Sequence, residues 1–549
     1  MGNRAHQIDI PAQSAVLDAA HVGDIRGAFG TIPVDDIGKR TSWMARFKTF
    51  MAIIGPGLIV MVGDNDAGAF GTYTQAGQNY GTALLWTLML LIPVLYVNQE
   101  MVLRLGVVSG VGHARLILER FGRFWGAFSV IDLFLVNALT IVTEFIGISL
   151  GLTFLGVPKI PGVIVSALLI MMAVSTGNFR RFERFSMVLV FASLLLVPVF
   201  IMVHPPLSQV AHDFLVPSFP QGAKLSDIML LVIGIVGTTV APWQLFFQQS
   251  YVIDKRITPR FIHYERWDLV LGIVLVIIGA VAMMAFAAHT FAGKPEFGNF
   301  ADAGAVASGI AKYFGKLPAQ LFAVALIDAC IIGASAVSLS TAYALGDVLS
   351  MSHSLHRKPK EAIGFYAVYF TLIVIAAALV LIPGTPLGLL TNAVQTLAGV
   401  LLPSASVFLL LLCNDKEVLG PWVNGRKLNI FTAAIVAILV MLSIILTAAV
   451  IFPDISSEAI VGILVGGSLI ALVVTLGVKV VQAKRTQVAP VVVTLAPVQD
   501  KTLWRMPTLA QLKPMNLTTG TLVWMGVLRG YLLIAICMVA YKVIRMALV

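Results

Sequence analysis

The sequence predicts an all-α polytopic membrane protein in which two inverted repeats of five helices are followed by further C-terminal helices. Three observations support this prediction. Of the 549 residues, 58% are hydrophobic and only 12% are charged, and apolar runs of membrane-spanning length recur along the chain. Lys and Arg collect in alternate loops between these runs. The first and sixth runs are interrupted by glycine, proline and polar residues.

Twelve spans follow from matching apolar runs to a window of about 20 residues. They lie at 52–77, 84–105, 126–152, 160–176, 184–203, 228–250, 268–292, 318–350, 363–383, 389–412, 429–452 and 459–482. A thirteenth candidate, 520–546, is interrupted by Arg529. It either crosses the membrane with a snorkelling arginine or lies partly in the interface.

These spans divide the chain into six parts. We expect a tail at 1–50, a first repeat at 51–203, a second repeat at 228–412, additional spans at 413–482, a linker at 483–519 and a C-terminal hydrophobic segment at 520–549. In the tail, Ile10 to Gly27 is compatible with one short amphipathic helix, but we expect a mostly disordered segment without a functional role. The proline-containing linker is expected to carry no chemistry.

The basic residues predict topology rather than a nucleic-acid surface. The tail and every second loop hold 29 Lys and Arg, whereas the opposite loops hold five, namely Lys159, Lys224, Lys294, Lys312 and Lys316. By the positive-inside rule this places the N-terminus in the cytoplasm. The net charge of +10 forms no basic stripe with interleaved aromatics, so we expect no nucleic-acid partner.

Cysteine and histidine are not placed for chemistry. Cys330, Cys413 and Cys537 lie in apolar runs without a CxxC pair, which excludes a disulfide framework and a thiolate metal site. None of the nine histidines falls in an interrupted run, and solvated side chains in tails and loops are expected for all except His289, which lies near a span end. No cleaved signal peptide is recognisable before the first span.

The first interruption places two carboxylates at the centre of a span. Within Gly55 to Gly81, the apolar run is broken by Asp64, Asn65 and Asp66. A charge at bilayer depth costs about 2.5 to 3.5 kcal/mol on insertion scales, so such residues are mostly functional and face a cavity. The flanking glycines permit the helix to end and restart here. We therefore expect a helix that is broken around an ion site.

The second interruption lies in the sixth span, at Gly237 to Gln244 with Pro242 inside it. Proline removes one backbone hydrogen bond and frees carbonyl oxygens that can act as ligands. Two breaks five spans apart are typical of inverted repeats that bind their substrate between discontinuous helices at the midplane. Carboxylates, carbonyls and a carboxamide form a hard oxygen site, which suits Mg²⁺, Mn²⁺ or Ca²⁺ better than softer metals.

A third polar group lies in the third span. Asn137, Thr140 and Glu144 share one helix face. Glu144 either relays ions or caps a buried hydrogen-bond network, and its position in the sequence leaves both roles open.

The residues at the two breaks resemble a known family. The stretch GPGLIVMVGDNDAGAFGTYTQAGQNYG resembles helix 1 of the natural resistance-associated macrophage protein (Nramp) family of divalent-metal transporters, and TTVAPWQLFFQQS occupies the place of its helix 6 motif. The order and spacing of spans also match from about 50 to 412. The resemblance implies the LeuT-like 5+5 inverted-repeat fold with broken helices 1 and 6.

The resemblance also implies roles for individual residues. Asp66 and Gly68 match the aspartate and glycine of the family's Asp-Pro-Gly-Asn motif. Gln395 matches the helix 10 glutamine that joins the ion when the site closes, and the carbonyls near Ala67 and Ala241 match the family's backbone ligands. Glu144 matches a helix 3 carboxylate that is associated with proton movement.

The departures from the family pattern point to a particular branch. Ala67 and Ala69 replace the motif's proline and asparagine, Ala241 and Trp243 replace the methionine and histidine of helix 6, and Ile141 replaces a helix 3 aspartate. This pattern resembles the Nramp-related magnesium transporter branch. Without the soft sulfur, and with a roomier site, the pocket suits a partly hydrated Mg²⁺.

The implied function is uptake of Mg²⁺, and of Mn²⁺ as a second substrate, by alternating access without obligatory proton coupling. Asp66 is expected to be the main anionic ligand, with Gln395 and the carbonyls of Ala67 and Ala241 as direct or water-mediated partners. Asp64, Asn65 and Gln244 are expected to support them, although Asp64 is also a candidate direct ligand. We expect no catalytic residues and no cofactor, and a location in a bacterial inner or plasma membrane; the oligomeric state is left open.

Four other functions compete with this one. The nearest is a proton-coupled transition-metal symporter of the ordinary Nramp type. A carrier of amino acids or other organic solutes would bind a substrate carboxylate at the half-helix N-termini, and the paired aspartates there would repel it. An intramembrane catalytic dyad of Asp64 and Asp66 is disfavoured because residues two apart on a helix point to different sides. Metal flux through the purified protein would exclude the fourth alternative, a receptor or scaffold.

Overall fold

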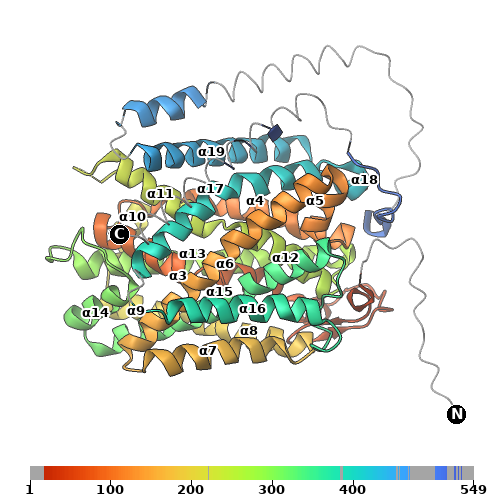
Figure 1. Ribbon diagram of the computed structural model, residues 1–549, viewed down its shortest axis with the longest axis horizontal. Coiled ribbons are helices and arrows are strands. Elements are labelled where there is room, and N and C mark those ends of the chain that lie inside the picture. Colours follow the sequence, from red (N-terminus) through yellow and green to blue (C-terminus); the bar gives the residue numbers. More distant parts are fainter. Residues whose placement is uncertain are drawn as a thin grey trace.

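The computed structural model describes residues 18–220, 222–383, 387–452, 456, 458–467, 469, 501–515, 525, 526, 530 and 533. Most helices run along the long axis of the molecule, so that loops gather at its two ends (Figure 1). Within the described residues, eight helices are long and apolar enough to cross a membrane, or ten if two bent helix pairs each count as one span. The expected polytopic helical fold is confirmed.

In the described part of the chain, eleven α-helices precede the second break. Their bounds are α1 Trp43–Ile53, α2 Pro56–Val62, α3 Ala67–Tyr80, α4 Trp86–Ser109, α5 His113–Phe121, α6 Arg123–Phe154, α7 Lys159–Val174, α8 Phe179–Ala192, α9 Leu196–Val203, α10 Leu207–Leu215 and α11 Leu225–Thr239. The 3₁₀ turn η2, Ser193–Leu195, joins α8 and α9 into one span.

The second part forms the remaining helices. Their bounds are α12 Pro242–Asp254, α13 Ile262–Phe291, α14 Ala303–Phe314, α15 Lys316–Val348, α16 Ile363–Val380, α17 Leu387–Cys413, α18 Lys416–Leu419 and α19 Arg426–Ile451, with 3₁₀ turns η3 Pro259–Phe261, η4 Gly420–Trp422 and η5 Lys501–Leu503. A further apolar helix spans Glu458–Gly467. Spans 1 to 11 therefore lie close to where the apolar runs placed them.

Both expected interruptions are present as breaks between helices. The first span is divided into α2 and α3, and the sixth into α11 and α12. One feature was not expected: α1 precedes α2 and is bent from it by 51° at Ile54 and Gly55. Of predicted span 12, the structure describes residues up to 467 and residue 469. The rest of that span, and nearly all of 520–546, lie outside the described residues.

The core is built where the broken helices cross their neighbours. Val60, Met61, Phe70, Tyr73 and Leu245 are all fully buried in the main apolar cluster. At the crossing of α11 and α17, a Cβ on Gly237 would lie 2.9 Å from backbone atoms of α17. Glycine is needed there because it lets the two backbones approach closely.

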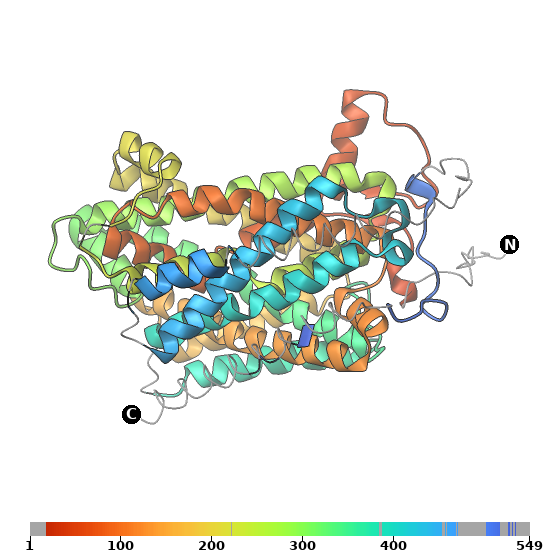
Figure 2. The same cartoon turned by 90° about the horizontal axis from the view of Figure 1, so that it is seen from above.

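The N-terminal segment differs from the expectation of a disordered tail or a short helix. From Asp18 onward it forms the 3₁₀ turn η1, Ala19–His21, and a hairpin of β1, Ile25–Arg26, and β2, Thr31–Ile32. The expectation of a mostly disordered tail is therefore wrong for residues 18–32, the alternative helix at Ile10 to Gly27 is not formed in its described part, and residues 1–17 lie outside the described residues. Figure 2 shows α10 and α14 at the end of the molecule opposite to this segment.

Candidate ion-binding site

The first break is formed by a tight turn and a helix cap. After α2, the amides of Asp64 and Asn65 donate to the carbonyls of Met61 and Val62, at 3.2 and 3.1 Å, so the chain turns more sharply than an α-helix. Asp66 is then extended, and its Oδ1 accepts a hydrogen bond of 2.9 Å from the amide of Ala69. Aspartate is a favoured N-cap, so the sequence restarts the helix here.

The second break is formed by proline at the first position of α12. α11 ends at Thr239, Ala241 is extended with φ −84° and ψ 143°, and Pro242 opens the next helix. Because proline has no N–H group, the carbonyl of Thr238, four residues earlier, loses its helical partner. The carbonyl of Ala241 accepts the amide of Gln244 at 3.2 Å, which leaves its second lone pair for another partner.

Side-chain hydrogen bonds join the two breaks. Nε2 of Gln244 donates to Oδ1 of Asp64, while Oε1 of Gln244 accepts from Nε2 of Gln99 at 2.9 Å. The hydroxyls of Tyr73 on α3 and Thr239 on α11 lie 2.6 Å apart. The breaks are therefore neighbours at one depth of the bundle, and Gln244 holds Asp64 in place.

Two further helices bring polar side chains to the first break. A Cβ on Gly68 would lie 1.7 Å from Nε2 of Gln395, so the glutamine of α17 lies directly across Gly68. Oε2 of Glu144, on α6, accepts from the amide of Ala67 at 3.2 Å, so the carboxyl groups of Glu144 and Asp66 both bind backbone amides at the start of α3. This hydrogen bond fits the second of the two roles left open for Glu144, capping a buried hydrogen-bond network, while the ion-relay role stays a prediction.

Asn65 and Asn137 each donate a hydrogen bond to a neighbouring helix. Nδ2 of Asn65 donates to the carbonyl of Val276 on α13 at 3.3 Å, and Nδ2 of Asn137 donates to Oγ1 of Thr341 on α15 at 2.8 Å. Gln99, which sequence reasoning missed, belongs instead to the chain that reaches Asp64. Its signal in the sequence was a pair of carboxamides, Asn98 and Gln99, inside an apolar run.

The break region retains unused bonding capacity. Among the described residues, four buried oxygens here have no hydrogen-bond partner: Oδ2 of Asp64, Oδ1 of Asn65, Oε1 of Glu144 and Oγ1 of Thr238. Buried polar atoms are usually satisfied, so a group of unsatisfied oxygens needs a reason. No three His, Cys, Asp or Glu side chains group as a metal site in the described part of the chain. A cation here would therefore need amide and backbone oxygens as well.

Two cavities adjoin the breaks from opposite ends. One small cavity is lined by Ala67 and Thr391 and reaches Asp302 at the start of α14. The other is lined by Pro242 and reaches Ile117 on α5. α14 and α5 lie at opposite ends of the molecule (Figure 1). The breaks therefore lie between two small cavities, one towards each end.

Comparisons with known proteins agree with this architecture. A family model described as natural resistance-associated macrophage protein-like matches residues 57–449. The chain is similar to the divalent metal cation transporter MntH of Ralstonia nicotianae, with 29% identity over 396 residues, covering 69% of this chain and 87% of that protein. It is also similar to the protein of the same name from Pectobacterium carotovorum subsp. carotovorum, with 27% identity over 428 residues, covering 76% and 98%.

Solved structures show the same fold. The Eremococcus coleocola manganese transporter in complex with an aromatic bis-isothiourea substituted compound superposes with a TM-score of 0.61 at 22% identity, covering 80% of this chain and 96% of that chain. A mutant of the same transporter superposes with a TM-score of 0.62 at 21% identity, covering 82% and 96%.

Proposed function

The chain belongs to the natural resistance-associated macrophage protein-like family, and from this premise we propose that it carries a divalent cation across a membrane, with Mg²⁺ as the preferred cargo and Mn²⁺ as a second. Members of this family are multi-pass membrane transporters and not enzymes. The observation that supports the cargo is the donor set at the breaks. It consists of the carboxylates of Asp64 and Asp66, amide oxygens, and backbone carbonyls.

The proposed ligands keep the roles that the sequence suggested. Asp66 is the main anionic ligand. The side chain of Gln395 packs against Gly68, so it lies within reach of a cation bound at Asp66. The carbonyls of Ala67 and Ala241 are proposed as backbone partners. Asp64, tied to Gln244, is proposed to add negative charge from the second layer around the cation.

The preference for Mg²⁺ rests on what the alanines omit. Ala67, Ala69 and Ala241 are buried and offer only backbone groups and methyl carbons. Mg²⁺ prefers oxygen ligands and retains several waters, whereas softer metals gain from sulfur or imidazole. Three small side chains around a carboxylate therefore favour a hydrated hard cation.

We further propose that uptake does not require proton coupling. A potential of 100 mV is worth about 2.3 kcal/mol per elementary charge, so a divalent cation is drawn inward by about 4.6 kcal/mol. We also propose an orientation in the membrane: the end that holds most of the loop Lys and Arg residues, together with the N-terminus, faces the cytoplasm.

The second candidate is a proton-coupled transition-metal symporter. One observation favours it: the carboxyl of Glu144 accepts a hydrogen bond from the amide of Ala67, the residue that follows Asp66, so a proton acceptor lies near the proposed ligand. The names of the MntH relatives are compatible with either candidate.

Transport by the purified protein in liposomes tests the proposal. With a negative interior and a Mg²⁺-sensitive dye inside, external Mg²⁺ should raise the dye signal. With a pH dye at zero potential, metal entry should leave the lumen pH unchanged. Absence of Mg²⁺ entry overturns the proposed cargo, and metal-driven acidification of the lumen establishes the second candidate.

A further inference from the structure

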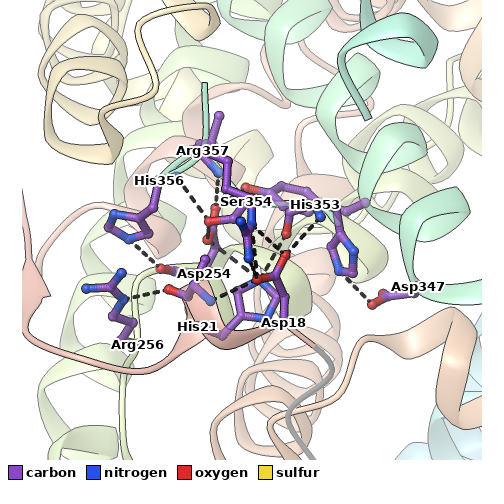
Figure 3. A network of polar contacts seen from close by, with 12 residues as sticks. Asp18, His21, Asp254, Arg256, Asp347, His353, Ser354, His356 and Arg357 are labelled. Atoms are coloured by element: carbon purple, nitrogen blue, oxygen red, sulfur yellow. Dashed lines mark hydrogen bonds and ion pairs between the residues drawn. The ribbon is translucent and has the colours of Figure 1, made fainter. Parts of the chain in front are cut away.

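The N-terminal segment is bound to the body of the protein at the end where α12 finishes. We call residues 18–32 the strap. Its turn η1 is capped by Asp18, whose Oδ1 accepts the amide of Ala20 at 2.8 Å, and its hairpin pairs Ile25 with Ile32. Figure 3 shows the strap residues Asp18 and His21 surrounded by side chains from α12 and from the loop between α15 and α16.

One set of contacts binds the strap to the loop between α15 and α16. The carboxylate of Asp18 accepts three hydrogen bonds from Arg357, with a shortest distance of 2.6 Å, and one from the amide of His353 at 3.1 Å. Burial alone would raise the pKa of Asp18, but the hydrogen bonds from Arg357 and from the amide of Ala20 outweigh this effect and lower the pKa to about 2. The ion pair therefore persists throughout the physiological pH range. The side chain of His21 is 5% exposed, and its Nε2 lies 3.1 Å from the carbonyl oxygen of His353.

A second set binds the strap to α12 and to the residues that follow it. Arg256, directly after α12, donates to the carbonyls of Ala20 and Asp24 at 2.9 and 3.2 Å. Asp254, the last residue of α12, is fully buried and accepts from Tyr343, Ser354 and the amide of Leu355 at 2.5 to 2.8 Å (Figure 3). The strap and the loop therefore share one anchor at the end of α12.

A third set binds the strap to the first repeat. The amide of Ala28 donates to Oε2 of Glu183 on α8 at 2.5 Å, and Arg184 donates back to the carbonyl of Ala28 at 2.8 Å. Ile25 and Ile32 are buried in an apolar cluster with Ile53 of α1 and with side chains of α4 and α12. The strap thus contacts both repeats at once.

The strap also covers the junction between the two half-helices that lead to the breaks. Nζ of Lys255, after α12, donates to the carbonyls of Ile53 and Ile54 at 2.5 and 2.9 Å and to Glu183 at 2.6 Å. Ile54 immediately precedes α2, so the start of α2 and the end of α12 meet under the strap. For this end of the pathway to open, α2 and α12 must move apart.

We infer that residues 18–32 form a releasable strap that holds α2 and α12 together and limits the opening of the pathway at this end. The inference rests on the proposed function only in assuming that opening here is a step of transport. These contacts predict that weakening the ion pair between Asp18 and Arg357 favours opening of the pathway at this end, and that joining the two positions covalently prevents it.

A reversible cross-link tests both directions in one protein. Asp18→Cys and Arg357→Cys are combined in a background where Cys330, Cys413 and Cys537 are alanine, and a short bis-methanethiosulfonate reagent joins the pair. Mn²⁺ flux into liposomes is expected to rise about twofold or more before cross-linking, to fall at least tenfold after it, and to return on reduction. Unchanged flux after complete cross-linking overturns the inference. A monofunctional reagent of the same chemistry controls for modification alone.

Hydrogen exchange gives a readout that does not depend on transport. Asp18→Asn and Arg357→Gln are expected to speed exchange of the amides of residues 53–59 at least threefold, whereas Arg26→Gln, which replaces an exposed side chain, should not. Equal exchange in all three variants and the wild type overturns the strap. Faster exchange together with no flux in any variant, including the unmodified background, means that the proposed function fails while the strap stands.

Discussion

In the middle of the molecule, Asp64 keeps one carboxylate oxygen without a partner among the described residues, whereas at the strap end Asp254 accepts three hydrogen bonds. Both side chains are fully buried. A buried carboxylate with spare capacity can bind a cation, while one with full hydrogen bonding serves as a fixed joint. The number of partners, and not burial or charge, distinguishes the region proposed for the ion from the region proposed for gating.

Removing one carboxylate from each region should have the largest effects and should separate cation binding from stability. Asp66→Ala is expected to abolish Mn²⁺ binding and uptake, by at least 100-fold, because the main anionic ligand is lost. Asp254→Asn is expected to retain Mn²⁺ affinity within about threefold but to lower the melting temperature, because it disturbs a satisfied hydrogen-bond joint. Isothermal titration and thermal unfolding in detergent measure the two effects. Loss of binding in Asp254→Asn alone contradicts this assignment.

Adding a soft ligand should sharpen the description of the ion region. Ala241→Met places a thioether beside the proposed backbone ligand and is expected to shift the ratio of Cd²⁺ to Mg²⁺ uptake about tenfold towards Cd²⁺, equivalent to about 1.4 kcal/mol. Ala241→Leu has a similar size without sulfur and is the matched control. An equal shift in both variants would mean that volume, and not ligand softness, sets selectivity.

Glu144→Gln tests whether the third carboxyl is needed at the break. Glutamine still offers an oxygen to the amide of Ala67, so Mg²⁺ uptake is expected to change by less than about threefold. Uptake in liposomes at a fixed potential measures this effect. A loss as large as that of Asp66→Ala would show that a proton path through Glu144 takes part in transport.

The smallest expected effect concerns the strap end and pH. Burial lowers the pKa of His353, but the carboxylate of Asp347, 3.0 Å away, raises it, to about 9, with a further contribution from Asp254. The charged form therefore contributes stability fully below the ordinary pKa of 6.5, and this contribution is lost as pH rises through about 9.

His353→Gln should accordingly lower the melting temperature by a few degrees at pH 7, and the difference from the wild type should disappear near pH 10. Thermal unfolding at the two pH values measures it. A difference that stays constant with pH would mean that His353 acts through packing and not through its charge.

The breaks could be predicted from the sequence because their causes are local. Glycine, aspartate and proline each set the backbone conformation within a few residues, so the ends of α2 and α11 follow from Gly63 and Pro242. The contact of Glu144 with Ala67 and the link from Gln99 to Gln244 could not be predicted, since they depend on how distant helices are rotated against one another.

The strap was missed for a related reason. Its sequence is short, contains glycines at 23, 27 and 30 and holds no long apolar run, and its order comes from partners more than 150 residues away, such as Glu183 and Arg357. The expectation of solvated histidines was wrong for His113 and His353, which are buried, and for the side chain of His21, which is only 5% exposed. Residue type alone could not reveal this, because the side chains that bury them come from other segments.

The central claim is that the two breaks form an oxygen-only site for a hydrated hard cation. Competition among Mg²⁺, Mn²⁺, Ca²⁺ and Cd²⁺ for uptake into liposomes, at a fixed negative potential, tests it most directly. The account predicts that Mg²⁺ is carried, that Mn²⁺ competes with it, and that Cd²⁺ competes poorly. Strong uptake of Cd²⁺ with no uptake of Mg²⁺ would contradict it.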